Sequence, residues 1–118
     1  MLKSGEDEKK IWKIRTVKTY PEAHNHIFVG RVLDITASYV RMDCKTYHFG
    51  KMVNSEKDIH TGSCMVRIIP WGRIEIINEL AESFDYINAQ ISGNNNGTLS
   101  IRDKHNVYSL VSVVGKKY

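Results

Sequence analysis

The sequence contains few cysteines, few prolines and no long apolar run. Its two cysteines, Cys44 and Cys64, are too few for the disulfide framework of a small secreted domain. No apolar stretch approaches the roughly 18–20 residues of a membrane-spanning helix. Residues 1–10 carry acids and lysines where a signal peptide would have an apolar core. We therefore expect a cytoplasmic protein with reduced thiols and no membrane association.

Sequence motifs that accompany catalysis are also missing. The chain has no glycine-rich phosphate loop after a strand, no G-x-S-x-G nucleophile elbow and no paired carboxylates. His24-Asn25-His26 shares three letters with a nuclease motif but lies in an expected linker, without the metal-binding frame of those enzymes. We predict a protein that is not an enzyme and needs no cofactor.

Four side chains of zinc-binding type have the spacing C-x3-H-x11-H-x3-C, namely Cys44, His48, His60 and Cys64. Residues four apart on an extended strand are about 13 Å apart at their Cα atoms, whereas zinc ligands lie about 2.0–2.3 Å from the ion. Cys44 and His48 could therefore share a metal only if the strand broke between them. We expect no metal site, with Cys44 in the core and His48 at a strand end.

Length and charge limit the remaining possibilities. A chain of 118 residues is the size of one domain, and 42% hydrophobic residues are enough to bury a core. The net charge of +4 is compatible with nucleic acid as a partner but lacks the dense basic stripe of a dedicated binder.

Alternation of apolar and polar residues predicts strands along most of the chain. The clearest strand is 39–45, where Val40, Met42 and Cys44 share one face and charged residues the other. Gly30, inside the preceding strand, indicates a bulge or sharp bend, as a small closing barrel needs. Further strands are expected at 11–20, 27–35, 64–69, 73–77, 98–102 and 107–113.

Loops and turns are expected between these strands. Residues 21–26 read as a linker, and residues 50–63, with two glycines and no sustained period, as a mobile loop. Pro70-Trp71-Gly72 predicts a corner, and GNNNG at 93–97 and Asp103–Asn106 predict hairpin turns. The spacing of the apolar residues in 78–92 is compatible with both a helix and a strand. We expect a helical turn near 78–84 and then a strand near 86–92.

Two stretches resemble the signatures of the Sm-like family, whose loose pattern is shared by other small SH3-like barrels. Phe28-x-Gly30-x-Val32 followed by Tyr39-Val40-x-Met42-Asp43 is similar to the first signature, and RIIPWGRI at 67–74 lies where the family has its second. The resemblance implies a mainly β fold: a small bent-strand SH3-like (Sm-like) barrel with an added C-terminal β-hairpin and room for one short helix. The expected organisation is a flexible tail at 1–10 and a single domain at 11–118, with its barrel core at 27–80 and a hairpin extension at 86–114.

The same resemblance implies a function. Sm-like proteins form homo-oligomeric rings of six or seven subunits that bind single-stranded RNA around the pore. By position, Tyr39, Trp71 and Arg73 would correspond to RNA contacts.

The residues themselves leave two functions open. Basic side chains interleaved with aromatic ones are what phosphate neutralisation and base stacking require, although an ordinary solvated strand face contains the same residue types. One function is a non-catalytic barrel that binds RNA or single-stranded nucleic acid; the alternative is a protein–protein interaction or assembly module that uses strand edges without nucleic acid. The candidate nucleic-acid-binding residues are Lys13, Arg15, Tyr39, Arg41, Lys45, Trp71 and Arg73.

Overall fold

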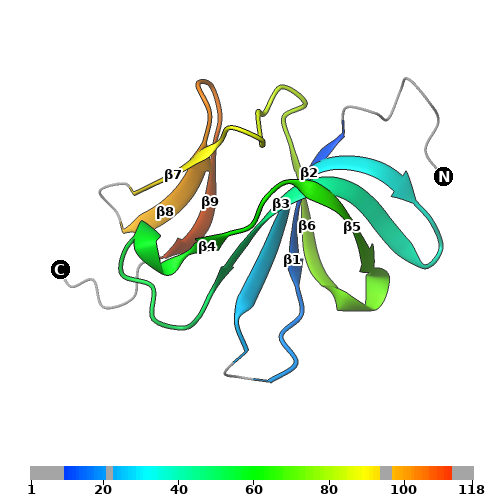
Figure 1. Ribbon diagram of the computed structural model, residues 1–118, viewed down its shortest axis with the longest axis horizontal. Coiled ribbons are helices and arrows are strands. Elements are labelled where there is room, and N and C mark those ends of the chain that lie inside the picture. Colours follow the sequence, from blue (N-terminus) through cyan, green and yellow to red (C-terminus); the bar gives the residue numbers. More distant parts are fainter. Residues whose placement is uncertain (1–9, 21–22, 94–96, 113–118) are drawn as a thin grey trace.

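The computed structural model of the chain describes residues 10–20, 23–93 and 97–112. Within these residues the protein is mainly β, with nine strands in two antiparallel sheets (Figure 1), which confirms the expected class. Most of the expected tail at 1–10, the asparagines of GNNNG and the chain after Ser112 lie outside the described residues. No helix among the described residues has the length and apolar character needed to cross a membrane.

The larger sheet has six strands in the order β4-β3-β2-β1-β6, with β5 pairing with β3 beside β4. A 3-10 turn, η2 (Trp71–Arg73), joins β5 to β6 at the predicted Pro70 corner. No hydrogen-bonded ladder joins β5 to β6 in the described parts of the chain, so the sheet curls without closing into a barrel. The strands are β1 (Ile11–Thr16), β2 (Asn25–Ile35), β3 (Tyr39–Phe49), β4 (His60–Thr61), β5 (Met65–Pro70) and β6 (Ile74–Leu80).

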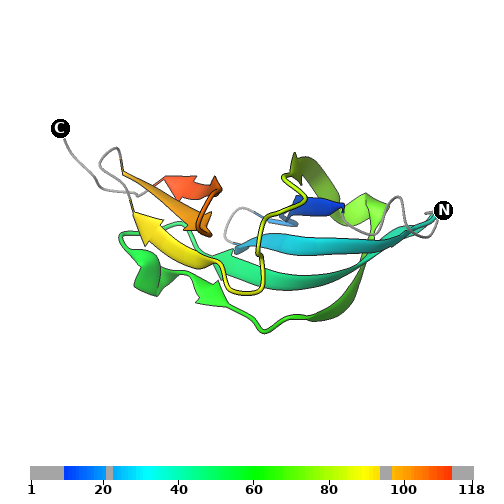
Figure 2. The same ribbon diagram turned by 90° about the horizontal axis from the view of Figure 1, so that it is seen from above.

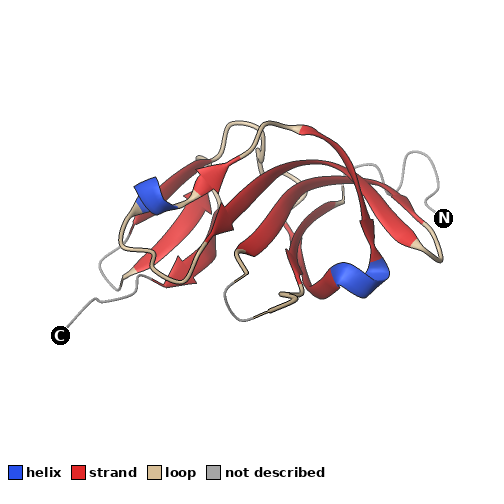
Figure 3. Ribbon diagram, turned by 60° about the horizontal axis from the view of Figure 1, so that its bottom comes forward, coloured by secondary structure: helices blue, strands red, loops and turns tan. Residues whose placement is uncertain are grey.

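The smaller sheet is formed by the C-terminal part of the chain. It has three strands, β7 (Gln90–Gly93), β8 (Thr98–Arg102) and β9 (Val107–Ser112). A strand was expected at each of these places, but β7 begins at Gln90 and not near residue 86. Seen from above, it lies over one end of the larger sheet (Figure 2). The two 3-10 turns, η1 (Glu56–Asp58) and η2, lie at opposite ends of the molecule (Figure 3).

Buried side chains form two clusters, because both faces of β2 and β3 are covered. The curl cluster lies inside the bend of the larger sheet and consists of Trp12, Ile14, Val32, Val40, Met42, Cys44 and Ile69. The intersheet cluster lies between the two sheets and consists of Ile11, Ile27, Val29, Tyr47, Phe49, Val53, Ile59, Phe84, Tyr86, Ala89, Leu99, Ile101 and Leu110. The C-terminal sheet is therefore part of the core of the protein.

The bend in β2 differs from the expectation. Gly30 remains in regular pairing with Cys44, and the register instead shifts between Val32 and Asp34, which leaves Leu33 as the bulged residue. Gly30 is needed for a different reason. A Cβ atom on Gly30 would lie 2.0 Å from the carbonyl oxygen of Asp43, so the two strands approach too closely there for any side chain.

Three loop and helix expectations are corrected by the structure. The helical turn expected near 78–84 is wrong at its start, because β6 continues to Leu80, which pairs with Ile11. The expected linker at 21–26 is shorter, since β2 begins at Asn25. The segment 50–63 contains η1 and β4, and it buries Val53 and Ile59 in the intersheet cluster.

Candidate functional site

Two of the predicted basic contacts hold the two sheets together. The ammonium group of Lys13 on β1 donates to the carbonyl oxygen of Ser109 on β9 at 2.7 Å. The ammonium group of Lys45 on β3 donates to the carbonyl oxygen of Ile87, before β7, at 3.1 Å. Burial, followed by the nearby charge of Arg15, lowers the pKa of Lys13. These lysines therefore have acceptors within the chain, at the seam between the sheets.

The next two predicted residues form ion pairs on the surface. Arg15 lies 3.2 Å from Glu75, and Arg41 lies 3.7 Å from Asp34. Such exposed pairs contribute little stability, but they reduce the positive potential of the strands that carry them. The polar face of β3, which we expected to be basic, therefore carries charges of both signs.

The remaining three residues lie around η2. The indole nitrogen of Trp71 donates to the carbonyl oxygen of Thr36 at 2.8 Å, so the ring packs against the β2–β3 turn. Tyr39 pairs with Pro70, immediately before Trp71. Arg73 is exposed, and its carbonyl oxygen accepts from the amide of Val17 at 2.8 Å. These three are the only predicted contacts that the structure brings to one corner of the described chain.

A cleft of about 350 Å³ opens beside this corner, at the mouth of the curled sheet. The guanidinium of Arg67 is held inside by the carbonyl oxygens of Cys44, at 2.5 Å, and Ser63, at 3.1 Å. None of the described lining residues is acidic. They are Thr16, His26, Phe28, Arg67, Ile68, Ile69, Pro70 and Arg73.

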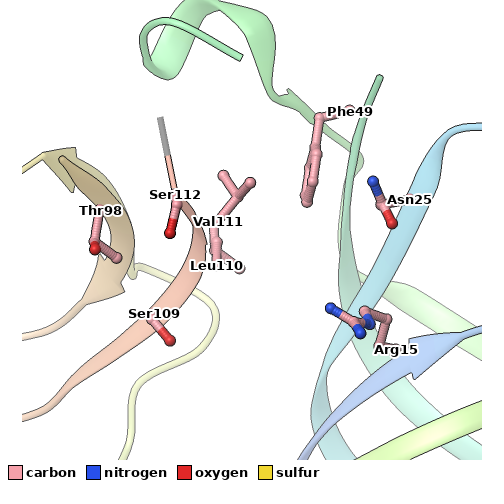
Figure 4. Close-up of a pocket in the computed structure, with 8 residues that line it drawn as sticks. All are labelled: Arg15, Asn25, Phe49, Thr98, Ser109, Leu110, Val111 and Ser112. Carbon is pink, nitrogen blue, oxygen red and sulfur yellow. The ribbon is translucent and has the colours of Figure 1, made fainter. Parts of the chain in front are cut away.

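A second cleft of about 370 Å³ lies between the sheets (Figure 4). Arg15, Asn25 and Phe49 line it from the larger sheet, opposite Thr98 and the end of β9. Its cation, Arg15, is already paired with Glu75. Arg15 is the only charged side chain among the described residues that line this cleft, so the cleft offers few charged contacts to a ligand.

Exposed apolar side chains gather on β5, η2 and β6. We call this group the edge patch: Met65, Val66, Ile68, Trp71 and Ile76, whose exposed fractions lie between 36 and 57%. Within the described residues β5 pairs only with β3 and β6 only with β1, so each strand has one edge without a neighbour. Apolar side chains beside open strand edges are typical of surfaces that pair with another chain.

Four of the five histidines of the chain form a histidine cluster that sequence reasoning missed. His26, His48 and His60 lie directly opposite one another on β2, β3 and β4. The ring of His48 lies in edge-to-face contact with those of His24, His26 and His60, at centroid distances of 5.7, 5.2 and 4.9 Å. His48 is therefore the centre of the cluster.

The bulge at Leu33 produces this alignment. Ile35 pairs with Val40 next to the turn, and a uniform ladder from that pair would place His26 opposite Phe49. The one-residue shift at the bulge places it opposite His48 instead, and residues opposite each other share a face of the sheet. Two adjacent alternating runs predicted the hairpin, but no sequence signal located its bulge.

Burial and mutual proximity both affect the cluster. Burial lowers the pKa of His48, and the neighbouring His26, His60 and His24 lower it further. Burial also lowers the pKa of His26, followed by the charges of His24 and Arg73. At neutral pH these effects favour the neutral imidazoles of His26 and His48, the form with a nitrogen lone pair available.

The cysteines do not join this cluster. Cys44 is buried in the curl cluster, and Cys64 packs against the intersheet cluster. Both thiols are free. Burial raises the pKa of Cys44 to about 11, which makes its thiol a poor nucleophile and ligand. Among the described residues, no group of three or more histidine, cysteine or acidic side chains is placed so that it could hold a metal ion.

Comparisons with protein-family models, with curated proteins and with solved structures found no match to this chain.

Proposed function

We propose that the protein is a non-catalytic module with an open, curled SH3-like sheet, and that it assembles with copies of itself through the open edges of β5 and β6. The edge patch carries this proposal, because it is apolar on β5 and on β6, and within the described residues each of these two strands has one edge without a neighbour. The order of strands, with the 3-10 turn η2 between β5 and β6, supports the SH3-like description. The function is then to present an assembled surface to other molecules.

A second copy of the chain is the occupant that these edges favour. β5 and β6 are different strands at the two ends of one curled sheet, so pairing β5 of one copy with β6 of the next is head-to-tail. A head-to-tail contact repeats around a closed ring if the rotation between copies closes. The proposed assembly is a ring, with Val66 and Ile68 facing Ile76 of the neighbour across each junction.

Charge substitutions on the two edges test the assembly. Native mass spectrometry of the wild-type protein should give a single closed oligomer. Ile68→Lys and Ile76→Lys should each reduce it to smaller species, because lysine on an edge opposes strand pairing. Val107→Lys, at an equally exposed apolar position on β9, should leave the mass unchanged.

Mixing the two edge variants makes the test specific for head-to-tail pairing. Ile68→Lys retains a normal β6 edge and Ile76→Lys a normal β5 edge, so an equimolar mixture should form a heterodimer with one intact junction. A monomeric wild-type protein would contradict the proposal. So would a symmetric dimer that only one of the two substitutions disrupts.

We propose nucleic-acid binding as the second function, supported by the cleft at the mouth of the curl. Arg67, Arg73 and His26 line it together with Phe28, and Trp71 lies next to it on η2. Single-stranded RNA would place phosphates near Arg73 and stack bases on Trp71 or Tyr39. Lys13, Lys45, Arg15 and Arg41 contribute less, because each has a partner within the chain.

Fluorescence anisotropy with a labelled single-stranded RNA tests this second function. Affinity should fall by orders of magnitude as salt rises from about 50 to about 200 mM. Arg73→Glu should abolish binding, whereas the matched reversal Arg102→Glu on β8 should not. Affinity that does not change with salt, or equal effects of the two reversals, would rule out this cleft.

A further inference from the structure

We propose that a single strand of RNA bound at the mouth of the curl continues past Arg73 into a third cleft, where Lys18 binds a phosphate and Tyr20 stacks on a base. This inference rests on the nucleic-acid binding proposed above as the second function. It adds two contact residues and a path for the strand. Neither residue is among the candidate contacts named from the sequence.

The third cleft adjoins the one at the mouth of the curl. We call the earlier cleft, of about 350 Å³, the mouth cleft, and this one, of about 440 Å³, the loop cleft. Both are lined by Thr16, His26 and Arg73, so the two clefts lie side by side along these residues. The remaining described lining residues of the loop cleft come from 17–20 and 23–24, where the chain leaves β1 and returns to β2.

Positive charge extends along both clefts. Arg67 lines the mouth cleft, Lys18 lines the loop cleft, and Arg73 lines both. The guanidinium of Arg67 is held by carbonyl oxygens, which leave its charge uncompensated. No acidic side chain occurs among the described residues that line either cleft. A chain of phosphates therefore matches the two clefts better than a neutral or cationic ligand does.

Aromatic rings favour RNA over an acidic peptide as the ligand. Tyr20, which lines the loop cleft, is 59% exposed. Phe28 lines the mouth cleft, and the exposed Trp71 lies beside it on η2. Bases stack on such rings whatever their sequence, whereas an acidic peptide needs only the cations. Rings and cations together along both clefts are what a single strand requires.

The size of the clefts fits one nucleotide in each. Both volumes lie within the range of about 300–1,000 Å³ that is typical of small-ligand pockets. A strand that occupies both would place neighbouring bases on the two sides of Arg73. His26 lies at the junction, and burial lowers its pKa and so favours the neutral ring. A neutral imidazole can donate and accept hydrogen bonds without adding charge.

Stacking on Tyr20 is tested by fluorescence anisotropy with a labelled oligouridine of about eight nucleotides, within the range of about 4–16 that one OB fold covers. Tyr20→Ala should weaken binding about fivefold or more, because a stacking ring is lost. Tyr20→Phe keeps the ring and should bind as the wild type does. Tyr20 and Lys18 lie outside both buried clusters, so variants at these positions should fold.

The phosphate contact of Lys18 is tested by salt dependence. Lys18→Gln should lower the slope of log affinity against log salt concentration by about one, because one phosphate contact is lost. Lys104 is an exposed lysine on the β8–β9 turn and lines neither cleft. Lys104→Gln is therefore the matched control and should keep the wild-type slope.

The outcomes separate this inference from the function on which it rests. A wild-type protein that does not bind oligouridine would overturn both. Binding that depends on Arg73 but is unchanged in Tyr20→Ala or in Lys18→Gln would overturn only the path into the loop cleft. A polyglutamate peptide that displaces the labelled RNA as well as unlabelled oligouridine does would assign the clefts to an acidic peptide instead.

Discussion

Gly30 on β2 lies directly against Cys44 on β3, where the backbones of the two strands come close together. An added Cβ would be 2.0 Å from the carbonyl oxygen of Asp43 and 2.6 Å from the Cα atom of Cys44. Both obstacles belong to a backbone that pairs on both sides, so neither can move alone. The curl of the larger sheet therefore depends on the absence of a side chain at this position.

Gly30→Ala should destabilise the protein by at least about 2 kcal/mol, because overpacking against backbone forces the strands apart. Gly72→Ala is the control, since no atom lies within 4 Å of its added Cβ, and it should change stability by less than about 0.5 kcal/mol. Urea unfolding followed by tryptophan fluorescence measures both. Equal stabilities of the two variants would contradict the close approach.

Two buried tyrosines should respond oppositely to loss of their hydroxyl groups. The hydroxyl of Tyr86 donates to the carboxylate of Asp43 at 2.5 Å and so joins the C-terminal segment to β3. The hydroxyl of Tyr47 is buried without a hydrogen-bond partner in the described structure. Tyr86→Phe should therefore cost about 2 kcal/mol, the range for hydrogen bonds to charged groups.

Tyr47→Phe should leave stability unchanged or raise it by up to about 1 kcal/mol, because it removes an unsatisfied polar atom and keeps the ring. The same urea titration compares the two variants directly. A loss of stability in Tyr47→Phe as large as that in Tyr86→Phe would show that the Tyr47 hydroxyl has an acceptor.

The strands of this protein could be predicted from local alternation, and several turns from their composition. The clean alternation of 39–45 predicted the first part of β3, and the corner predicted at Pro70 is occupied by η2. Asp103–Asn106 forms the predicted turn, because the Asp103 carboxylate accepts the amides of His105 and Asn106. In each case the signal and the structure it specifies lie within a few residues.

Features that depend on pairing between distant residues could not be predicted in this way. β6 remains extended to Leu80 because β1 lies beside it, although the local sequence also fits a helix. Lys13 and Lys45 look like solvated cations in the sequence, but the smaller sheet supplies carbonyl acceptors to both. The histidine cluster depends on the bulge at Leu33, which has no signature of its own.

The two thiols should differ sharply in reactivity. Cys44 is fully buried, and burial raises its pKa to about 11. Only about one Cys44 in a thousand would then be thiolate at about pH 8. Cys64 is partly exposed, and burial raises its pKa as well. A disulfide reagent should therefore titrate one thiol quickly in the native protein, and the second only as the chain unfolds.

Substitutions assign the two reaction phases. Cys64→Ser should remove the fast phase and Cys44→Ser the slow one. Adding urea below the unfolding midpoint should accelerate only the slow phase, because Cys44 becomes accessible through opening of the curl cluster. A fast reaction of Cys44 in the folded Cys64→Ser variant would contradict the buried position.

Asp103 should make part of the stability of the protein dependent on acid pH. Its carboxylate accepts the backbone amide of Asp85 and those of His105 and Asn106 in the β8–β9 turn, and these bonds lower the pKa of Asp103 to about 2. Because the folded pKa is below the unfolded value of about 3.9, the ionised group stabilises the folded state above that value. This contribution is lost as the pH falls from about 4 to about 2.

Asp103→Asn should therefore lower the melting temperature at neutral pH, and its difference from the wild type should shrink below about pH 4 and vanish near pH 2. Lys104→Gln, in the same turn, should leave the acid limb of the wild-type profile unchanged. Circular dichroism melts across this pH range measure both variants. If the Asp103→Asn protein retained the full pH dependence of the wild type between these values, a different carboxylate would control the acid transition.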